Sequence, residues 1–242
     1  MTPKILVTIC NYNHSKYLKQ SIESIQDQTY ENLDICVVDD GSDDVDLVSE
    51  IVNQKIKEDS RVRYISLEKN TGKWNALNRA IATTDAVYCT SHDADDVSLR
   101  QRLELQAITL QKTNTIHNLC GFEHCWSEDD VNKHLYNQFD ISSFPCIDAD
   151  NCSQLVTSGF STPGINHYYT GNFETAGVSA LFLKQIWDIG VRFNPPGKGL
   201  RVLISEDSDF NFRVTTLVGR TSICAEKPYL YRRHTSTNTE EF

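Results

Sequence analysis

Acidic side chains gather in three short segments of this 242-residue chain, and each segment could take part in chemistry. Their sequences are VVDDGSDD at residues 37–44, SHDADD at 91–96 and SEDSD at 205–209. Carboxylates this close together repel one another, so each group needs a nearby cation, a helix N-terminus or full hydration. The three segments are therefore the first places to look for a functional site.

The segment SHDADD is compatible with a metal site. Asp93 and Asp95 can share one divalent ion and leave positions open for water and for phosphate oxygens, an arrangement that Mg²⁺ and Mn²⁺ favour. An EF-hand is excluded, because its fifth and sixth positions would be Val97 and Ser98. A solvated acidic turn that caps the next helix has the same spacing. Spacing alone leaves the metal site and the turn equally open.

The segment SEDSD precedes an apolar helical pattern. Ser and Asp commonly cap helices, and acidic residues in a first turn suit the helix dipole. This explanation is sufficient for Glu206, Asp207 and Asp209. The alternative is that one of them is a catalytic general base, which requires a partner site nearby.

Apolar periodicity predicts that strands and helices alternate over the first 113 residues. The predicted strands are 4–10, 33–40, 61–67 and 86–91, and the predicted helices are 15–28, 45–59, 73–84 and 100–113. This order predicts βαβ units in a parallel sheet that is covered on both faces. Ligands of such sheets bind at the carboxyl ends of the strands. Both acidic turns lie at those ends, so we expect them to converge.

The second half has a less regular pattern. It predicts a strand at 115–126, loops and short strands over 127–170, and a helix over 176–190 that ends at Gly190. A capped helix is predicted over 205–219 with Phe210, Val214 and Leu217 facing inward, and a last strand over 222–234. We expect a single domain over 1–242, with a smaller subregion contributed by the second half.

Composition limits the possible functions. A formal charge of −10 argues against nucleic-acid binding, which depends on Lys and Arg to neutralise phosphates. No apolar run is long enough to span a membrane, and the N-terminal run is too short for a signal peptide. The eight cysteines form no C-x-x-C pair and predict buried, reduced thiols, as in a cytoplasmic protein. Neither G-x-G-x-x-G nor G-x-x-x-x-G-K-[ST] is present, so a nicotinamide-type Rossmann site and a P-loop are unsupported.

Five motifs in order resemble one enzyme family. They are VTICNYNHSKYLKQSIESIQDQTYENLDICVVDDGSDD from residue 7, NTGKWNALNRAI from 70, HDADDVSLRQRLELQ from 92, ISEDSDFNFR from 204 and YLYRRHTSTN from 229. Together they resemble the inverting glycosyltransferases of family 2. The resemblance implies the nucleotide-diphospho-sugar transferase fold called GT-A: an α/β fold with a Rossmann-like, mostly parallel central sheet flanked by helices. Residues 1–115 would be the nucleotide-sugar-binding half, and 116–242 the half with the acceptor site and catalytic base.

The resemblance implies donor-binding residues in the first half. Cys10 and Tyr12 would contact the nucleotide base, although Cys10 stands where the family more often has proline or threonine. Asp40 would bond a ring N–H of the base, and Lys73 would meet the diphosphate.

The resemblance also implies roles for the residues nearest the reaction. Asp93 would lie near the ribose and the metal, Asp95 would be the principal metal ligand, and Asp96 would face the donor sugar or the acceptor. Asp207 would be the general base, and His234 would close over the diphosphate or the metal.

The implied activity is metal-dependent transfer, with inversion, from a nucleoside-diphosphate sugar to an acceptor hydroxyl. The cofactor would be Mn²⁺ or Mg²⁺, and a UDP-sugar is the favoured donor. The acceptor would be a glycan or another hydroxyl compound, as in glycan or polysaccharide synthesis. Its binding is expected to involve the variable stretch 123–172. Membrane association would follow only from a lipid-linked acceptor. The oligomeric state and the linkage formed stay open.

Two alternatives remain from the residues. DADDV at 93–97 formally fits the D-x-D-x-[TV] motif of magnesium-dependent phosphotransferases of the haloacid dehalogenase type. That motif normally follows the first strand, whereas three strands are predicted before it here. The other alternative is a sugar-nucleotide-binding module without catalysis, which the presence of Asp207 beside an intact D-x-D-D argues against.

Overall fold

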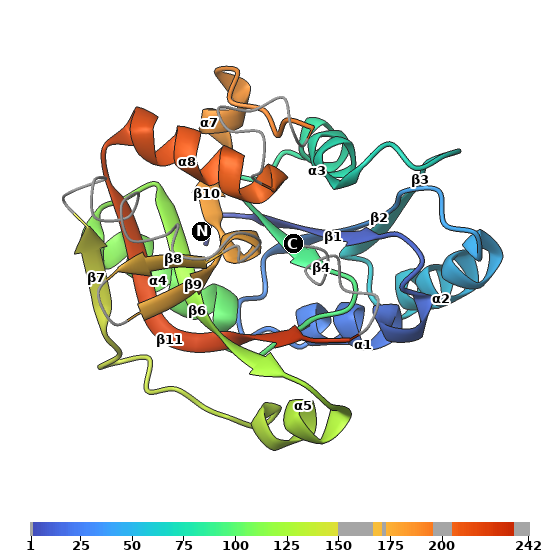
Figure 1. The fold of residues 1–242 in the computed structure, drawn as a ribbon, viewed down its shortest axis with the longest axis horizontal. Coiled ribbons are helices and arrows are strands. Elements are labelled where there is room, and N and C mark those ends of the chain that lie inside the picture. Colours follow the sequence, from blue (N-terminus) through green and yellow to red (C-terminus); the bar gives the residue numbers. More distant parts are fainter. Residues whose placement is uncertain (1, 150–166, 171–172, 196–204, 235–242) are drawn as a thin grey trace.

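A twisted sheet of parallel strands forms the N-terminal half of the molecule (Figure 1). The computed structural model describes residues 2–149, 167–170, 173–195 and 205–234. Within them, four parallel strands lie in the order β3-β2-β1-β4. Their bounds are β1 Ile5–Asn11, β2 Leu33–Asp39, β3 Val62–Ser66 and β4 Tyr88–Asp93.

The sheet continues into the C-terminal half through a short antiparallel strand. β10 (Leu181–Leu183) lies between β4 and β6 (His117–Cys125), and β6 pairs in parallel with β11 (Thr221–Arg232). Four further short strands join this half, of which β5 and β7 pair with β11, and β9 pairs with both β6 and β8. They are β5 Val97–Ser98, β7 Cys146–Ala149, β8 His167–Thr170 and β9 Phe173–Ala176.

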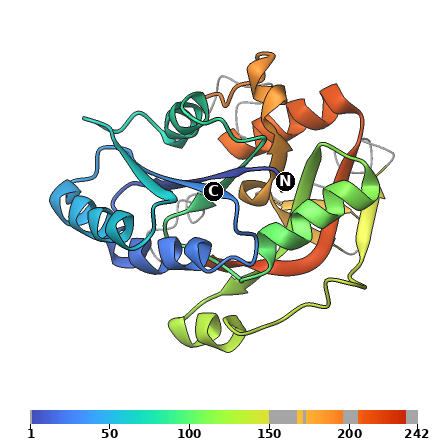
Figure 2. The ribbon, with the colours of Figure 1, turned by 180° about the vertical axis from the view of Figure 1, so that it is seen from behind.

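Helices cover both faces of the sheet (Figures 1 and 2). One face packs against α1, α2 and α4, and the other against α3, α7 and α8. A short helix α5 and a single 3₁₀ turn η1 complete the described elements. The bounds are α1 Ser15–Gln26, α2 Val45–Glu58, α3 Lys73–Ala82, α4 Arg102–Thr113, α5 Glu128–His134, η1 Gly177–Ser179, α7 Lys184–Asp188 and α8 Glu206–Val218.

The alternation of side chains along β1 explains the layered core. Ile5, Val7 and Ile9 point to the face covered by α1 and α2, whereas Leu6 packs in the opposite cluster with α3. All four side chains are fully buried. Burying side chains of this size contributes about 1.5–3 kcal/mol each. A strand with apolar residues on both faces therefore requires helices on both sides.

The predicted α/β class and mostly parallel sheet are confirmed, and all eight elements predicted up to residue 113 are present. The single helix predicted over 176–190 is wrong. That segment forms η1, then β10, then the five-residue helix α7. The reason is tertiary, because residues 181–183 fill the space between β4 and β6 with backbone hydrogen bonds. The predicted end at Gly190 holds, with a φ of 114° that favours glycine.

Two smaller predictions in the second half are also corrected. Residues 127–170 were expected to hold only loops and short strands, but α5 begins after Ser127, whose side chain accepts from the backbone N–H of Asp130. Leu217 is 54% exposed rather than inward, while Phe210 and Val214 are fully buried. The stretch 123–172 expected to bind the acceptor lies partly outside the described residues.

The described cysteines are all free thiols, and most of them are buried. Across the described ranges, no helix is both long enough and apolar enough to cross a bilayer.

Phe210 anchors α8 to the sheet. Its ring stacks on Phe193 at a centroid distance of 4.0 Å and lies 4.8 Å from Phe182. We expect Phe210→Ala to lower the free energy of unfolding by about 3–5 kcal/mol, because it opens a cavity in this cluster. Urea denaturation measures the change. Leu217→Ala, on the exposed side of the same helix, is the control and should change it by less than about 0.5 kcal/mol. Equal losses from both variants would contradict the assigned burial of α8.

Candidate active site

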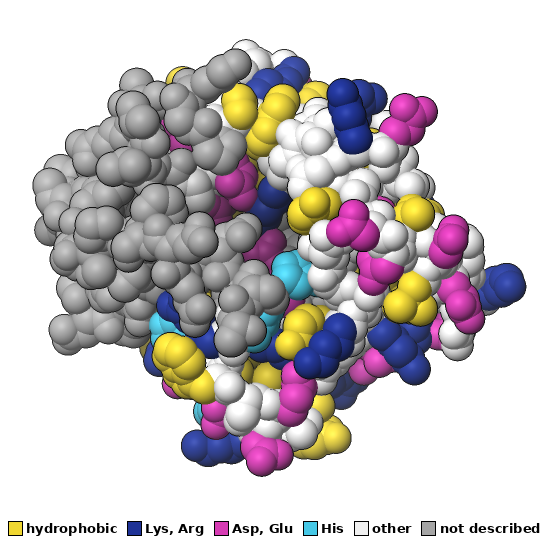
Figure 3. Space-filling view, turned by 45° about the vertical axis from the view of Figure 1, so that its right-hand side comes forward, with side chains coloured by type: hydrophobic (Ala, Val, Ile, Leu, Met, Phe, Trp, Pro, Cys, Tyr) yellow, Lys and Arg dark blue, Asp and Glu magenta, His cyan; other side chains and the backbone are white. Residues whose placement is uncertain are grey.

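Acidic, basic and histidine side chains meet in a hollow on one face of the molecule (Figure 3). The D-x-D-D turn lies where β4 ends at Asp93 and the chain turns into β5. Cys10 at the end of β1 stands opposite Asp93 in register, so the carboxyl ends of both strands meet here. This is the edge at which parallel sheets bind ligands.

Asp96 is buried and bound on both carboxylate oxygens. The Tyr229 hydroxyl donates to Oδ2 at 2.6 Å, and the backbone N–H of Arg232 donates to Oδ1 at 2.8 Å. Burial, followed by the charges of Asp95 and Asp93, raises the pKa of Asp96 well above its usual value. Asp96 therefore links the acidic turn to β11, and the expected role toward sugar or acceptor stays a prediction.

Asp95 is 8% exposed and has a different environment. His234 Nε2 donates to its Oδ2 at 2.9 Å, and the Arg232 guanidinium donates to its backbone carbonyl. Burial would raise the pKa of Asp95, but the bond from His234 and the neighbouring His14 together lower it. Asp95 is thus held as a carboxylate, which is the form that binds a cation.

Lys73 lies between the acidic turn and α8. Its Nζ is 2.6 Å from Asp93 Oδ1 and 3.8 Å from Glu206 Oε1. Burial disfavours its charge, yet the carboxylates of Asp93, Glu206 and Asp207 outweigh burial and raise the pKa of Lys73 well above its usual value. The ammonium group is therefore a fixed positive charge that joins the two acidic segments.

Asp207 lies in the first turn of α8 and is 4% exposed. Its Oδ1 accepts from the Ser205 hydroxyl and from the backbone N–H of Ser208, the latter at 2.7 Å. Its Oδ2 faces Gly177, where a Cβ would lie 3.2 Å away. A side chain at Gly177 would crowd that oxygen, so the glycine makes room for the carboxylate. A carboxylate with one oxygen fixed by hydrogen bonds is compatible with a general base.

Asp40 is buried and already has backbone partners. Its carboxylate accepts from the backbone N–H groups of Thr71 at 2.9 Å and Gly72 at 2.7 Å. Gly72 has a φ of 94°, which side chains disfavour, and the next residue begins α3. Asp40 thereby fixes the start of the helix that carries Lys73. The expected contact of Asp40 with a nucleotide base stays a prediction.

The expected base-contacting residues lie at the end of β1. Tyr12 is 41% exposed, while Cys10 is half-buried. Burial raises the pKa of the Cys10 thiol well above its usual value, so it is a neutral thiol at the floor of this edge. Their contacts with a nucleotide base stay predictions.

Arg102 supports the acidic turn from beneath. Its guanidinium is fully buried, donates to Ser98 Oγ and Thr90 Oγ1 at 2.9 Å each, and lies 4.9 Å from the centroid of the Tyr229 ring. Burial and the charge of Arg102 lower the pKa of His92 well below its usual value, so His92 is neutral. A buried cation thus lies under a turn that carries three carboxylates.

The donor atoms suit a divalent cation. The carboxylates of Asp93, Asp95 and Asp96 have oxygens within 4.8 Å of one another, and so do the ligand atoms of Asp95, His14 and His234. Because both oxygens of Asp96 accept hydrogen bonds, Asp95 is the carboxylate best placed to bind a cation, with His234 beside it. Oxygen and imidazole nitrogen are both common ligands of Mn²⁺-type ions.

The structure brings most of the predicted site residues together, from segments far apart in the chain. Asp93, Asp95, Lys73 and Asp207 form one charged group with Glu206, and His234 joins it through Asp95. The sequence leaves Glu206 open between helix capping and a catalytic base, and its motifs give no role to His14. His14 follows the first predicted strand, so the rule that carboxyl ends converge was a signal for it.

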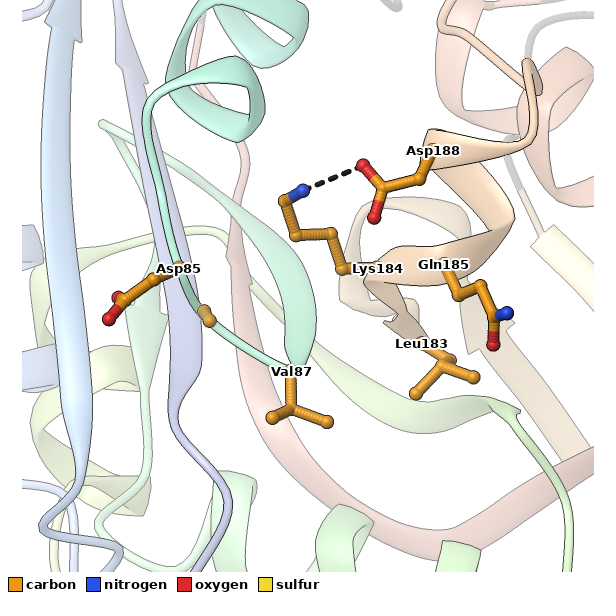
Figure 4. A pocket seen from close by; sticks show the side chains of 7 residues that line it. Asp85, Val87, Leu183, Lys184, Gln185 and Asp188 are labelled. Carbon is orange, nitrogen blue, oxygen red and sulfur yellow. Dashed lines mark hydrogen bonds and ion pairs between the residues drawn. The ribbon is translucent and has the colours of Figure 1, made fainter.

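A shallow pocket of about 290 Å³ lies elsewhere, beside the start of β4 and the end of β10 (Figure 4). Val87 and Leu183 line it, with the ion pair of Lys184 and Asp188 at 2.7 Å. It adjoins the amino end of β4, away from the acidic turn. It is therefore separate from the candidate site.

Glu206 is a source of pH-dependent instability. Burial and the charge of Asp207 raise the pKa of its carboxyl above 4.5, although Lys73 opposes them. The Glu206 carboxyl thus binds a proton more tightly in the folded state than in the unfolded state. The free energy of unfolding therefore falls as the pH rises above about 4.5, where the unfolded state loses this proton first. We expect Glu206→Gln to increase the free energy of unfolding at pH 7 and to lose this advantage towards pH 4.

Urea denaturation at both pH values tests this expectation. Glu50→Gln, on the exposed side of α2, is the matched control and should change stability by less than about 0.5 kcal/mol. A Glu206→Gln variant that is less stable than the parent at pH 7 would contradict the assigned electrostatics.

Curated relatives match more than half of this chain. An uncharacterized glycosyltransferase of Haemophilus influenzae is 31% identical over 156 residues, which cover 64% of this chain and 48% of the relative. The glycosyltransferase GlyG of Streptococcus pneumoniae is 32% identical over 56% of this chain and 44% of its own length. The matched region thus spans about half the length of these relatives.

Solved structures share the fold. TarS 1-349 of S. aureus in complex with UDP-GlcNAc has a TM-score of 0.69 and 16% identity over 99% of this chain and 61% of its own. The mannosyltransferase PcManGT of Pyrobaculum calidifontis, in complex with GDP-Man and Mn²⁺, has a TM-score of 0.63 and 16% identity over 98% of this chain and 59% of its own. At this identity the likeness shows the fold alone.

The family model described as "Glycosyl transferase family 2" matches residues 6–185, about three quarters of the chain. This match extends from β1 into α7 and includes the acidic turn, whose position after the fourth strand also speaks against the phosphotransferase alternative. The chain belongs to glycosyltransferase family 2.

Proposed function

We propose that this protein is a metal-dependent, inverting glycosyltransferase that moves a sugar from a nucleoside-diphosphate sugar to an acceptor hydroxyl. The observation that carries the proposal is the contact of Lys73 with Asp93 and Glu206, which brings the D-x-D-D turn and the start of α8 to one edge of the sheet. A cation-binding group and a carboxylate base then border the same space. A module that only binds nucleotides has no need for the carboxylate base.

Residues 1–115 are proposed to bind the donor, with Asp93 near the ribose and Lys73 near the diphosphate. A positive charge already lies at Lys73, and the diphosphate would compete with Asp93 for it. Cys10, Tyr12 and Asp40 remain the candidates for contact with the base. We favour a UDP-sugar, and TarS, which has the same fold, binds UDP-GlcNAc. Because PcManGT binds GDP-Man, a test of the donor must include guanosine as well.

Asp95, Asp93 and His234 are proposed to hold a divalent cation, Mn²⁺ or Mg²⁺. When bound, the cation would stabilise the charge that develops on the leaving nucleoside diphosphate. The support is the donor set described above and the Mn²⁺ in the PcManGT complex.

Asp207 is proposed to be the general base. Its Oδ2 would take the proton from the acceptor hydroxyl while that hydroxyl attacks the anomeric carbon from the side opposite the diphosphate, which inverts the configuration. The pair of Ser205 and Ser208 orients the carboxylate through Oδ1. Asp96 stays the candidate for contact with the donor sugar or the acceptor, although its hydrogen bonds favour an anchoring role.

The acceptor is proposed to bind the half formed by residues 116–242, and the product to be a glycan or polysaccharide. A bacterial chondroitin synthase of Escherichia coli is 36% identical to this chain over 103 residues, which supports glycan synthesis as the general process.

Asp207→Asn tests the proposed base. The amide keeps the size of the side chain and the bond from Ser205 but cannot take a proton at neutral pH. We expect transfer of sugar from the best donor to fall by about 10²–10⁴-fold, the usual share of general-base catalysis. Nucleotide release and glycosylated product are measured for a panel of UDP- and GDP-sugars with Mn²⁺.

Donor binding by the same variant is the control for this experiment. Its affinity for the nucleotide should stay within about threefold of the parent value, because Asp207 acts on the acceptor. Unchanged transfer by Asp207→Asn would contradict the assignment of the base. Strong nucleotide binding with no transfer from any donor by the parent protein would instead favour the non-catalytic module.

A further inference from the structure

His14 lies beside the proposed cation site although nothing in the sequence motifs assigns it a role. It occupies the N-cap position of α1, where Ser, Thr, Asp or Asn is usual, and its side chain makes no capping hydrogen bond. Formation of the helix therefore does not explain a histidine here. Its imidazole instead points to the D-x-D-D turn, with a ligand atom within 4.8 Å of those of Asp95 and His234.

The loop before His14 is fixed by hydrogen bonds. Asn13 has a φ of 59°, a left-handed conformation that asparagine tolerates better than most residues. Its backbone N–H donates to Ser42 Oγ at 2.9 Å, and its side-chain oxygen accepts from the backbone N–H of Asp43 at 2.8 Å. The direction of the His14 side chain is thereby set by the β1–α1 loop and by the D-D-G-S turn.

His234 is oriented by contacts with two aromatic rings at the start of α1. Its ring lies 5.0 Å from the Tyr17 ring and 5.5 Å from the His14 ring, centroid to centroid. The Arg232 guanidinium lies 4.5 Å from the centroid of the Tyr17 ring and donates to the backbone carbonyl of Asp95. The two imidazoles and the Asp95 carboxylate thus come from three separate segments and meet at one point.

The spacing of these atoms matches one metal ion. Ligands at about 2.1 Å from a six-coordinate ion lie about 3.0 Å apart when adjacent and about 4.2 Å apart when opposite. The distance from His234 Nε2 to Asp95 Oδ2 is 2.9 Å, and all three ligand atoms lie within 4.8 Å of one another. Binding of an ion would displace the Nε2 proton of His234 that now lies between these two atoms, and a small movement of the side chains would bring the three ligand atoms onto a single ion.

We propose that His14 is a third protein ligand of the cation, and that His14, Asp95 and His234 form a site of two imidazoles and one carboxylate that binds Co²⁺ and Mn²⁺ in preference to Mg²⁺. Mg²⁺ favours oxygen ligands and retained water, whereas imidazole nitrogen favours the first-row transition ions, with Co²⁺ above Mn²⁺. In this set His14 takes the place given above to Asp93, whose Oδ1 is paired with Lys73. Three protein ligands would leave positions for diphosphate oxygens and water. The inference rests on the proposed function only for that diphosphate, because the cation site itself is defined by the protein.

Binding of Mn²⁺ and Co²⁺ alone to the full chain, with no nucleotide present, tests the proposal by calorimetry. We expect His14→Ala to weaken both by at least about tenfold and to leave the Mg²⁺ dissociation constant within about a factor of three. His14→Asp keeps a good helix cap and replaces nitrogen with oxygen, so it should shift the preference towards Mg²⁺. His134→Ala, at the end of α5, is the matched control and should bind all three ions as the parent does.

Pulsed electron paramagnetic resonance of the Mn²⁺-loaded protein provides a direct readout. We expect ¹⁴N coupling from two imidazoles in the parent and from one in His14→Ala. Unchanged Mn²⁺ affinity together with unchanged nitrogen coupling in His14→Ala would overturn the proposal, as would a parent protein that does not bind Mn²⁺. Loss of transfer in Asp207→Asn with unaltered Mn²⁺ binding in His14→Ala would refute this inference and leave the proposed function standing. Weakened Mn²⁺ binding in His14→Ala, together with a parent protein that transfers sugar from no donor, would support this inference and refute the proposed function.

Discussion

Repulsion among the carboxylates at the end of β4 is the interaction on which the arrangement of the other elements depends. Two like charges about 4 Å apart near a protein surface repel by about 4 kcal/mol. The molecule brings Asp93, Asp95 and Asp96 into one turn and adds Glu206 and Asp207 from α8. Such a group persists only where cations and hydrogen-bond donors are fixed around it, so these define what the surrounding elements must supply.

Each neighbouring element supplies one of those partners. Helix α3 contributes Lys73, and its start is fixed by Asp40 through the backbone of residues 71 and 72. Strand β11 contributes Tyr229 and Arg232 after an irregularity in its register with β6 between Cys224 and Tyr229. Beyond this irregularity β11 stays paired with β6 and also pairs with β5, which directly follows the acidic turn. The positions of α3 and β11 are thus coupled to the charges of the site.

The charge distribution also separates the roles of the three turn carboxylates. Both oxygens of Asp96 accept hydrogen bonds, and its pKa is raised. Asp93 is paired with Lys73. Asp95 lies beside the imidazoles of His14 and His234, and the pKa of Asp95 is lowered. Asp96 therefore anchors the turn to β11, Asp93 joins the two acidic segments through Lys73, and Asp95 is the carboxylate suited to bind a cation. A cation bound at Asp95 would further reduce the repulsion that the turn creates.

Strong periodicity made the first half of the fold predictable from the sequence. The strands of β1 to β4 carry apolar residues on both faces and the helices between them carry one apolar stripe, so each local pattern agrees with the tertiary structure. The segment 176–190 was not predictable in this way. Its apolar residues fit a helix as well as a strand, and the pairing of residues 181–183 with β4 and β6 decides between them.

The sequence predicted where the site lies, but only some of the residues that form it. The rule that parallel strands bind ligands at their carboxyl ends placed both acidic turns together, and the family resemblance added Asp207 and His234. Spacing could not show that Asp96 turns inward to Tyr229, because that depends on a strand more than 100 residues away. Glu206 was hidden by its second role in the first turn of a helix, where an acidic residue is expected in any case.

The proposed function requires that the acidic edge bind a nucleoside diphosphate through a divalent cation. This requirement is examined by measuring the melting temperature of the parent protein and of Asp95→Asn with UDP or GDP, each with and without Mn²⁺. We expect nucleotide and Mn²⁺ together to raise the melting temperature of the parent by more than the sum of their separate effects, and Asp95→Asn to abolish this excess. Equal stabilisation by nucleotide with and without Mn²⁺, or an excess that survives in Asp95→Asn, would contradict it.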